Sequence, residues 1–181
     1  AWLPGTASAF YVAPSGTAAN VFATASDDGT QSLALANPFF TNAGPVSTLQ
    51  IDANGVISLG ATPALGYTPS GAGFSGNAFP SFAAWHDYNE AEAGSGRIKY
   101  EEVSGVLYVT WDGVENYGNA APSVCNVQFQ FNLASGVVTI VFQAISADTT
   151  STFGSNYLVG WKAEGPVADG GSQVQIGRAH V

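Results

Sequence analysis

The side chains of this sequence that can do chemistry are mainly carboxylates, and they gather in three short segments. The first segment is Asp27-Asp28-Gly29, where two adjacent carboxylates stand beside a glycine. Such a pair can hold a hard cation such as calcium through side-chain and backbone oxygens. Asp and Gly are also residues that turns prefer, so the segment is either a pair of calcium ligands or an ordinary turn.

The other two segments, residues 86–92 (His-Asp-Tyr-Asn-Glu-Ala-Glu) and 112–116 (Asp-Gly-Val-Glu-Asn), carry further acids, and three interpretations of them are open. An oxygen-rich acidic cluster suits calcium. Two of its carboxylates, spaced by about 5–5.5 Å or about 6.5–9.5 Å, could instead serve a glycoside hydrolase, with Trp85 or Trp111 stacking on the sugar. The acids could also be solvated loop residues beside tryptophans that are buried in the core.

The calcium hypothesis has a defined set of ligands, and no other cofactor is predicted. Zinc is disfavoured because, outside the last residues of the chain, only His86 and Cys125 offer imidazole or thiolate. Cys125 begins an amphipathic strand, so we expect a core residue rather than a nucleophile. The sequence contains no Gly-x-Ser-x-Gly elbow, and we predict no catalytic residues. The calcium candidates are Asp27, Asp28, Asp87, Glu90, Asp112 and Glu115.

The elements that must position these residues are strands. From Cys125 to Leu133 apolar residues alternate with amides, and this period of two predicts a strand with one buried face. A turn then leads into a partner strand at Val137–Phe142. Two further hairpins are predicted, one through Asn54-Gly55 within residues 49–59 and one through Ser104-Gly105 within residues 97–111.

The whole pattern predicts an all-β fold, an antiparallel β-sandwich or jelly roll of about ten short strands. Residues 60–80 form the longest predicted loop, and at most a short helical turn is expected near residues 83–93. Trp111 and Trp161 lie in phase with apolar neighbours, which favours burial. The weaker predicted strands are Phe10–Val12, Asn20–Thr24, Gln31–Leu35, Tyr157–Lys162 and Gln173–Ile176.

One domain is expected at residues 20–176, preceded by an arm or linker at residues 1–19. Trp2 lies in that arm, which could pair with the sheet edge of a neighbouring subunit or simply lead from an upstream domain. Residues 177–181 are expected to be non-native, because the chain from Ile176 onward resembles one reading frame of a sequencing adapter, as in a metagenomic or draft assembly.

Composition limits the partners of this chain. Its 181 residues are 46% hydrophobic but only 9% charged, and the formal net charge is -9. No nucleic-acid partner is expected and anionic membranes are disfavoured, since both require a basic face and the chain has 4 Lys and Arg residues in total. No apolar run approaches the roughly 18–20 residues of a membrane-spanning helix.

The order of several motifs resembles nidogen-like modules of bacterial secreted and cell-surface proteins. The resemblance rests on the Asp27-Asp28-Gly29 segment, on the first of the two turn-defined hairpins, on Trp85-His86-Asp87-Tyr88-Asn89, and on the strands that follow as far as Trp161. His86 and Trp161 depart from the family pattern. The resemblance implies an extracellular adhesion, matrix or accessory module, and it carries no catalytic residues.

We therefore expect a non-enzymatic secreted or cell-surface module, stabilised by calcium. Its expected partners are other surface proteins, glycans or copies of itself. The first alternative is a structural subunit that assembles into filaments or a surface layer. The second is a polysaccharide-active enzyme that uses the loop carboxylates at residues 86–92 and 112–115.

Overall fold

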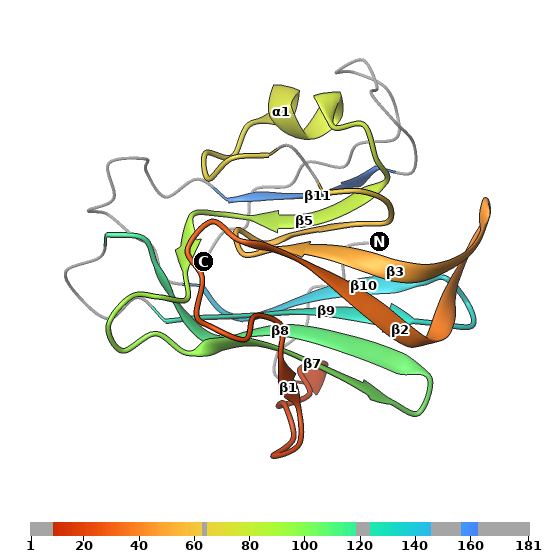
Figure 1. Cartoon of the computed structure of the whole chain (residues 1–181), viewed down its shortest axis with the longest axis horizontal. Helices are drawn as coiled ribbons and strands as arrows, with labels where there is room; N and C mark the ends of the chain where they lie inside the picture. Colours follow the sequence, from red (N-terminus) through yellow and green to blue (C-terminus); the bar gives the residue numbers. More distant parts are fainter. Residues whose placement is uncertain (1–8, 63–64, 119–123, 146–156, 163–181) are drawn as a thin grey trace.

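The computed structural model describes residues 9–62, 65–118, 124–145 and 157–162, which form two antiparallel sheets packed face to face (Figure 1). The predicted β-sandwich is therefore confirmed. One sheet has the strand order β1-β7-β8-β9-β10, with β6 paired to the end of β8. Its strands are β1 (Ala19–Asn20), β6 (Tyr88–Asn89), β7 (Arg97–Val103), β8 (Val106–Asn116), β9 (Cys125–Asn132) and β10 (Val138–Ala144).

The second sheet has the strand order β11-β5-β4-β3-β2. Its described strands are β2 (Thr30–Thr41), β3 (Gly44–Asp52), β4 (Val56–Ser58), β5 (Ser81–Trp85) and β11 (Leu158–Lys162). A single short helix, α1 (Gly71–Gly76), occurs in the described residues and lies beside β5 and β11 in Figure 1.

The predicted hairpins form where the sequence supplies residues for left-handed backbone. The turn between β3 and β4 places Gly55 at a φ of 82°, and an added Cβ there would lie 2.3 Å from the carbonyl oxygen of Ala84. Between β7 and β8, Ser104 and Gly105 have φ values of 51° and 78°, as a two-residue hairpin requires. Both turns therefore fix the register of their strands.

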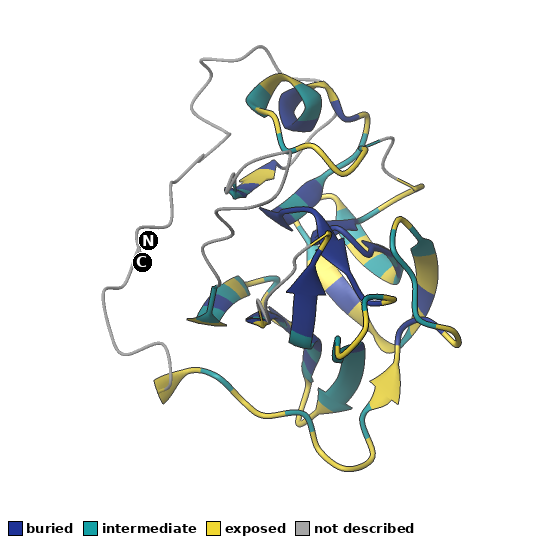
Figure 2. Ribbon diagram, turned by 90° about the vertical axis from the view of Figure 1, so that its left-hand side faces the viewer, coloured by how far each residue is buried: buried dark blue, intermediate teal, exposed yellow. Residues whose placement is uncertain are grey.

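The core lies between the two sheets, as Figure 2 shows by the buried residues at the centre of the molecule. On β9 the predicted alternation is confirmed, since Cys125, Val127, Phe129 and Phe131 are all fully buried. Phe131 contacts Phe82 of the opposite sheet edge to face, with ring centroids 5.5 Å apart. Aromatic pairs of this kind add about 0.5–1.5 kcal/mol to the effect of burial alone.

The outer face of β4 and β5 is also covered, because α1 packs on it. Phe74 of α1 is fully buried against Val56, Trp85 and Leu158. The helix begins at Ser70, whose hydroxyl accepts a hydrogen bond from the Gly73 amide at 3.0 Å. The β5 region is thus buried on both faces, which makes it a rigid support for the loop that follows it.

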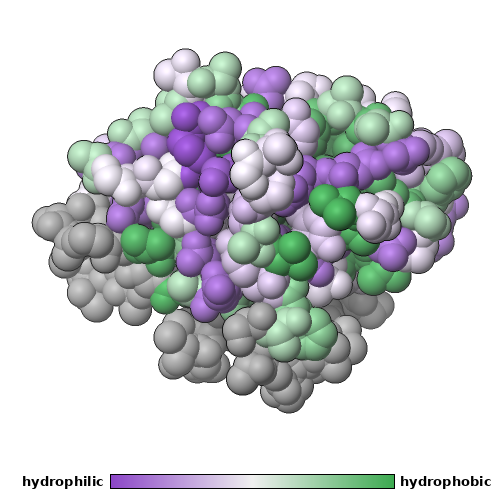
Figure 3. All heavy atoms as spheres, turned by 90° about the horizontal axis from the view of Figure 1, so that it is seen from below, coloured by the Kyte–Doolittle hydropathy of each residue, from purple (hydrophilic) through white to green (hydrophobic). Residues whose placement is uncertain are grey.

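Part of the expected N-terminal arm lies across the outer, amide-rich face of β9. The Gln128 side chain donates to the carbonyl of Val12 at 2.6 Å and accepts from its amide at 3.1 Å. Gln128 is fully buried as a result, although it lies on the polar side of its strand. Figure 3 shows this side of the molecule, where hydrophilic residues are interspersed with hydrophobic ones.

Four local expectations differ from the structure. The short helix lies at residues 71–76, in the expected loop, whereas residues 83–93 carry β5 and β6. Residues 10–12 form no strand, because they are held by side chains rather than by a strand ladder. Residues 21–24 form bends rather than strand, and only Asn20 of that expected element is paired, in β1.

The fourth difference concerns Trp161, which was expected to be buried and is 41% exposed. It lies on β11, the edge strand of its described sheet, on the face opposite to buried Leu158 and Lys162. An edge strand has no neighbouring strand on one side. Trp161 can therefore be exposed although it lies on the same face of the strand as the apolar Val159. Trp111, on a central strand, is fully buried as expected.

Trp2, residues 173–176 and the expected tail at 177–181 lie outside the described residues. Within the described part of the chain, no helix has the length and apolar character needed to cross a membrane.

Candidate metal centre

Three connecting segments meet at one end of the sandwich. These are residues 26–29 before β2, the turn at residues 52–55 between β3 and β4, and residues 86–87 between β5 and β6. Backbone hydrogen bonds join them: the Ala53 amide donates to Gly29 at 2.8 Å, and the His86 amide donates to Asn54 at 3.1 Å. Because each segment is short and follows or precedes a strand, the three are held in a defined arrangement.

The meeting point brings three carboxylates together. Ligand oxygens of Asp27, Asp28 and Asp87 all lie within 4.8 Å of one another. They line a pocket of about 150 Å³, together with Tyr67 and Tyr117. This volume exceeds the share of about 30 Å³ that one water molecule takes in the liquid, so the pocket has room for a cation and for further ligands.

Two of the three carboxylates have oxygens without a protein partner. Asp87 is only 5% exposed, and no hydrogen bond or ion pair reaches its carboxylate from the described residues. Oδ1 of Asp27 is buried and likewise has no hydrogen-bond partner in the described part of the chain. A buried acceptor that makes no hydrogen bond costs about 1–3 kcal/mol, and a charged one costs more, so Oδ1 of Asp27 in particular would be stabilised by a positively charged ligand.

The electrostatics of the pocket agree with this. Burial, and then the charges of Asp27 and Asp28, raise the pKa of Asp87 to about 7. Burial and the nearby carboxylates of Asp28 and Glu92 also raise the pKa of Asp27. The carboxylates repel each other in their ionised forms, and a bound cation would remove that repulsion.

Asn54 connects the pocket to the core. Its Nδ2 donates to Oδ1 of Asp28 at 3.0 Å, and its Oδ1 accepts from the amide of Tyr88 at 3.0 Å. Its own amide donates to Oδ1 of Asp52 at 2.9 Å. Asn54 is 2% exposed, so one side chain links the segment of Asp28 to the segment of Asp87.

Asp52 lies behind this turn rather than in the pocket. Burial raises its pKa to about 7, although the Asn54 amide and the Thr30 hydroxyl lower it in part, and the charge of Asp28 raises it further. Thr30 donates to Oδ2 of Asp52 at 3.1 Å. Asp52 therefore adds negative charge behind the pocket when it is ionised.

Gly29 is closely packed against neighbouring side chains in the acidic segment. A Cβ at Gly29 would lie 2.2 Å from Oγ of Ser26 and 3.1 Å from the Phe22 ring. The Asp27-Asp28-Gly29 sequence therefore forms a tight bend and also contributes to a carboxylate cluster, so the two interpretations of this segment are compatible.

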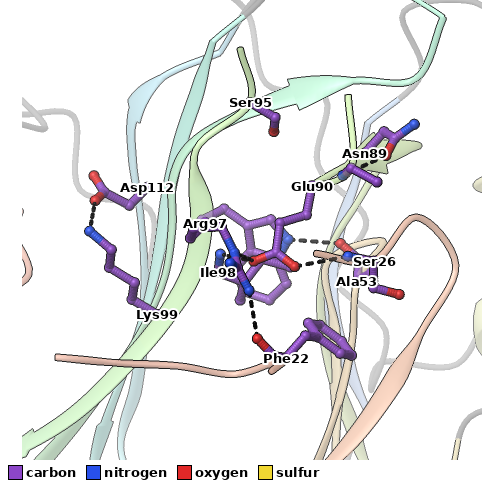
Figure 4. Close-up of polar contacts among 12 residues, drawn as sticks. Phe22, Ser26, Ala53, Asn89, Glu90, Ser95, Arg97, Ile98, Lys99 and Asp112 are labelled. Atoms are coloured by element: carbon purple, nitrogen blue, oxygen red, sulfur yellow. Dashed lines mark hydrogen bonds and ion pairs between the residues drawn. The ribbon is translucent and has the colours of Figure 1, made fainter. Parts of the chain in front are cut away.

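Glu90 lies close to the same segment but is engaged by the protein (Figure 4). Its Oε1 accepts from Nε of Arg97 at 2.7 Å and from the amide of Ile98 at 2.8 Å. Its Oε2 accepts from the amide of Ser26 at 3.1 Å. Arg97 also donates to the carbonyl of Phe22 at 2.6 Å. Glu90 thus anchors the segment that carries Asp27 and Asp28, and its oxygens are directed to these donors.

The structure does not bring the remaining two candidates into the trio. Asp112 forms an ion pair with Lys99 at 2.7 Å, and both side chains are partly exposed (Figure 4). Glu115 is 5% exposed on β8, opposite Asn89 of β6. The structure therefore gathers Asp27, Asp28 and Asp87, and places Glu90, Asp112 and Glu115 outside that group.

Sequence patterns did not identify Asn54, Tyr67 or Tyr117 as part of the site. Asn54 was assigned only to a turn, since Asn-Gly is a turn signal in itself. Tyr67 lies within the predicted loop at residues 60–80 and Tyr117 follows the end of a strand, and no local sequence pattern connects either residue with Asp27. The backbone contact between the Tyr117 amide and the Asp87 carbonyl, 3.0 Å long, arises only in the folded chain.

The chemistry of the group favours a hard cation. The trio contains no imidazole or thiolate, so it offers carboxylate oxygens alone, which suit calcium and magnesium rather than zinc. Calcium takes about six to eight oxygens in flexible geometry, and three carboxylates that bind through one or two oxygens supply about half of them or more. The rest would come from the open side of the pocket.

In a comparison with family models, residues 5–176 match the family described as NIDO related. Searches of the curated proteins and of the solved structures gave no match. The matched range spans both sheets and all three segments of the pocket.

Proposed function

Because the chain belongs to the NIDO-related family, we propose that it is a non-enzymatic extracellular module whose fold is stabilised by calcium at the pocket of Asp27, Asp28 and Asp87. The nidogen-like resemblance seen in the sequence is confirmed by the family match, and the family is typically extracellular. Secretion, a bacterial source, and a role in adhesion or in a matrix remain predictions.

One observation carries the calcium part of this proposal. Oδ1 of Asp27 is buried without a hydrogen-bond partner in the described residues, and it lies in the same cluster as the carboxylates of Asp28 and Asp87, a residue that is 5% exposed overall. An uncompensated group of this kind destabilises the fold by itself. A divalent cation would supply the missing positive charge and join residues 27–28 to residue 87, which are far apart in the chain.

The positions of the other acids favour a binding module over a glycosidase. A glycoside hydrolase needs two carboxylates free to act on opposite sides of a bond. Glu90 is held by Arg97 and two backbone amides, and Asp112 is paired with Lys99. The enzyme and the self-assembling subunit remain alternative predictions, and neither has a specific observation in its favour.

The test is a thermal melt of the whole chain with calcium and with a chelator. A ligand that binds only the native state adds about 2.7 kcal/mol at about 100 times its dissociation constant. In a domain of this size each kcal/mol raises the melting temperature by about 2–4 °C, so a rise of about 5–10 °C is expected. Asp87→Asn should abolish the rise.

Asp112→Asn is the matched control, since it removes a carboxylate of the same type outside the pocket. The calcium-dependent rise should survive in this variant. An unchanged melting temperature of the unsubstituted chain in calcium and in chelator would contradict the proposal, as would an equal loss of the rise in both variants.

A further inference from the structure

The mouth of the pocket carries two aromatic side chains that the calcium hypothesis does not use. Tyr67 and Tyr117 line the pocket with the three aspartates and are 41% and 43% exposed. They come from different parts of the chain, before α1 and after β8. Exposed tyrosines beside carboxylates are a combination suited to ligands with both hydroxyl groups and apolar C–H faces.

The three aspartates supply only part of the coordination that the proposed cation needs. The ligands all come from the aspartates at the wall of the pocket, and calcium takes about six to eight oxygens. The remaining ligands would have to come from within the pocket, which Tyr67 and Tyr117 also line. A ligand that supplies two neighbouring oxygens could occupy them by displacing water.

Charge selects among such ligands. Three ionised carboxylates and one divalent cation leave one net negative charge, and Asp52 and Glu92 act on the same carboxylates. A carboxylate or phosphate from a partner would therefore meet repulsion. A neutral pair of hydroxyl groups has no such penalty and can donate hydrogen bonds to carboxylate oxygens.

We infer that the pocket of Asp27, Asp28, Asp87, Tyr67 and Tyr117 binds a neutral saccharide, whose neighbouring hydroxyl groups complete the coordination of the calcium ion while a tyrosine ring packs on its C–H face. This inference rests on the proposed calcium site. It adds the class of ligand, and it assigns a role to Tyr117, which is positioned by the bond of its amide to the carbonyl of Asp87.

The experiment uses methyl mannoside, methyl fucoside and methyl galactoside as probes, because each presents a different pair of neighbouring hydroxyl groups. Saturation-transfer NMR on the whole chain should detect at least one of them in calcium and none in chelator. Asp87→Asn should lose the signal. Tyr117→Ala should weaken the affinity about tenfold, while Tyr117→Phe, which keeps the ring, should change it little.

Binding of the metal alone is followed separately by terbium luminescence, which nearby tyrosines sensitise. If terbium and calcium bind but no glycoside gives a signal, the saccharide inference is overturned and the calcium proposal stands. A glycoside signal that persists in chelator, or binding of a short acidic peptide in place of the glycosides, would also overturn it. Absence of metal binding would overturn both.

Discussion

At the scale of single residues, Asn54 determines how the pocket is assembled. It uses both atoms of its amide group and its backbone amide to join Asp28, Tyr88 and Asp52. The buried residue thus satisfies two partners with its side chain and a third with its backbone, and it holds Asp28 near Asp87. Substitution of Asn54 should therefore change the affinity for the proposed metal ion as well as the free energy of unfolding.

Asn54→Ala should lower the free energy of unfolding by about 1–3 kcal/mol, because the Asp28 carboxylate loses a hydrogen-bond donor and the Tyr88 amide keeps only its bond to the carbonyl of His86. It should also weaken terbium binding, since Asp28 is no longer held. Both quantities can be measured on the same sample, by denaturant unfolding and by luminescence titration.

Asn132→Ala is a suitable control for this prediction. Oδ1 of Asn132 also accepts a backbone hydrogen bond in a turn, from Ser135 at 3.0 Å, but the residue is exposed and remote in the fold. It should change stability little and terbium affinity not at all. Equal effects of the two substitutions on terbium affinity would contradict the positioning role of Asn54.

At the scale of elements, Lys162 joins α1 to β11. Its side chain is 1% exposed, and its Nζ donates to the carbonyl of Ser75 at 3.1 Å and to the carbonyl of Asn77. Burial lowers its pKa. These carbonyls lie at the end of α1, where helical backbone has no partner of its own and a cation is favoured.

Lys162→Met should therefore detach the end of α1 while it retains most of the volume of the side chain. The expected loss of stability is about 1–3 kcal/mol for carbonyls that are left buried without a partner. Hydrogen exchange should increase at residues 71–77 more than elsewhere.

Lys99→Met is the comparison, because the ion pair of Lys99 with Asp112 is partly exposed and contributes about 0–1 kcal/mol. If Lys162→Met leaves the exchange of residues 71–77 at its original rate, the coupling between α1 and β11 is weaker than the contacts indicate.

Strands and turns were predictable from the sequence where neighbouring residues alone determine their conformation. The alternation at residues 125–133 and the Asn54-Gly55 turn specify their hairpins without help from distant residues. The helix at residues 71–76 was not predictable in this way, because its Gly-rich sequence has low helix propensity and it depends on burial of Phe74.

The carboxylate cluster was predictable in its residue types, but which acids belong to it was not. Asp87 was grouped with Asp112 and Glu115 because the segment at residues 86–92 lies between predicted strands and could reach the loop at residues 112–116. The fold instead places Asp87 against Asp27 and Asp28, through the β3–β4 turn. Arg97 and Lys99 form ion pairs with acids that the strand register brings next to them. Amino-acid composition holds no information on that register.

At the scale of the whole molecule, the carboxylates predict how stability depends on pH. The pKa of Asp87 and that of Asp52 are about 7 in the folded chain, against an ordinary value of 3.8. The folded state then binds more protons than the unfolded state between these values. The contribution of the two groups is therefore fully present below about pH 4 and is lost as the pH rises through about 7.

In chelator, the melting temperature should accordingly fall as the pH is raised from about 5 to about 8. In calcium the fall should be smaller, since the metal stabilises the ionised carboxylates and competes with protons. Asp87→Asn should flatten the profile in chelator. A melting temperature that rises over this range in chelator would show that the carboxylates are compensated in some other way.

The distance along the chain between the parts of the pocket has a consequence for the order of events in folding. Ser26 and Glu90, which anchor it, are 64 residues apart in sequence and meet only when both sheets are in place. Contacts of such long range form late, and a ligand that depends on them is absent from the transition state for folding. Calcium should therefore slow unfolding and leave the folding rate nearly unchanged, so that the ion protects the finished module from opening and does not assist its formation.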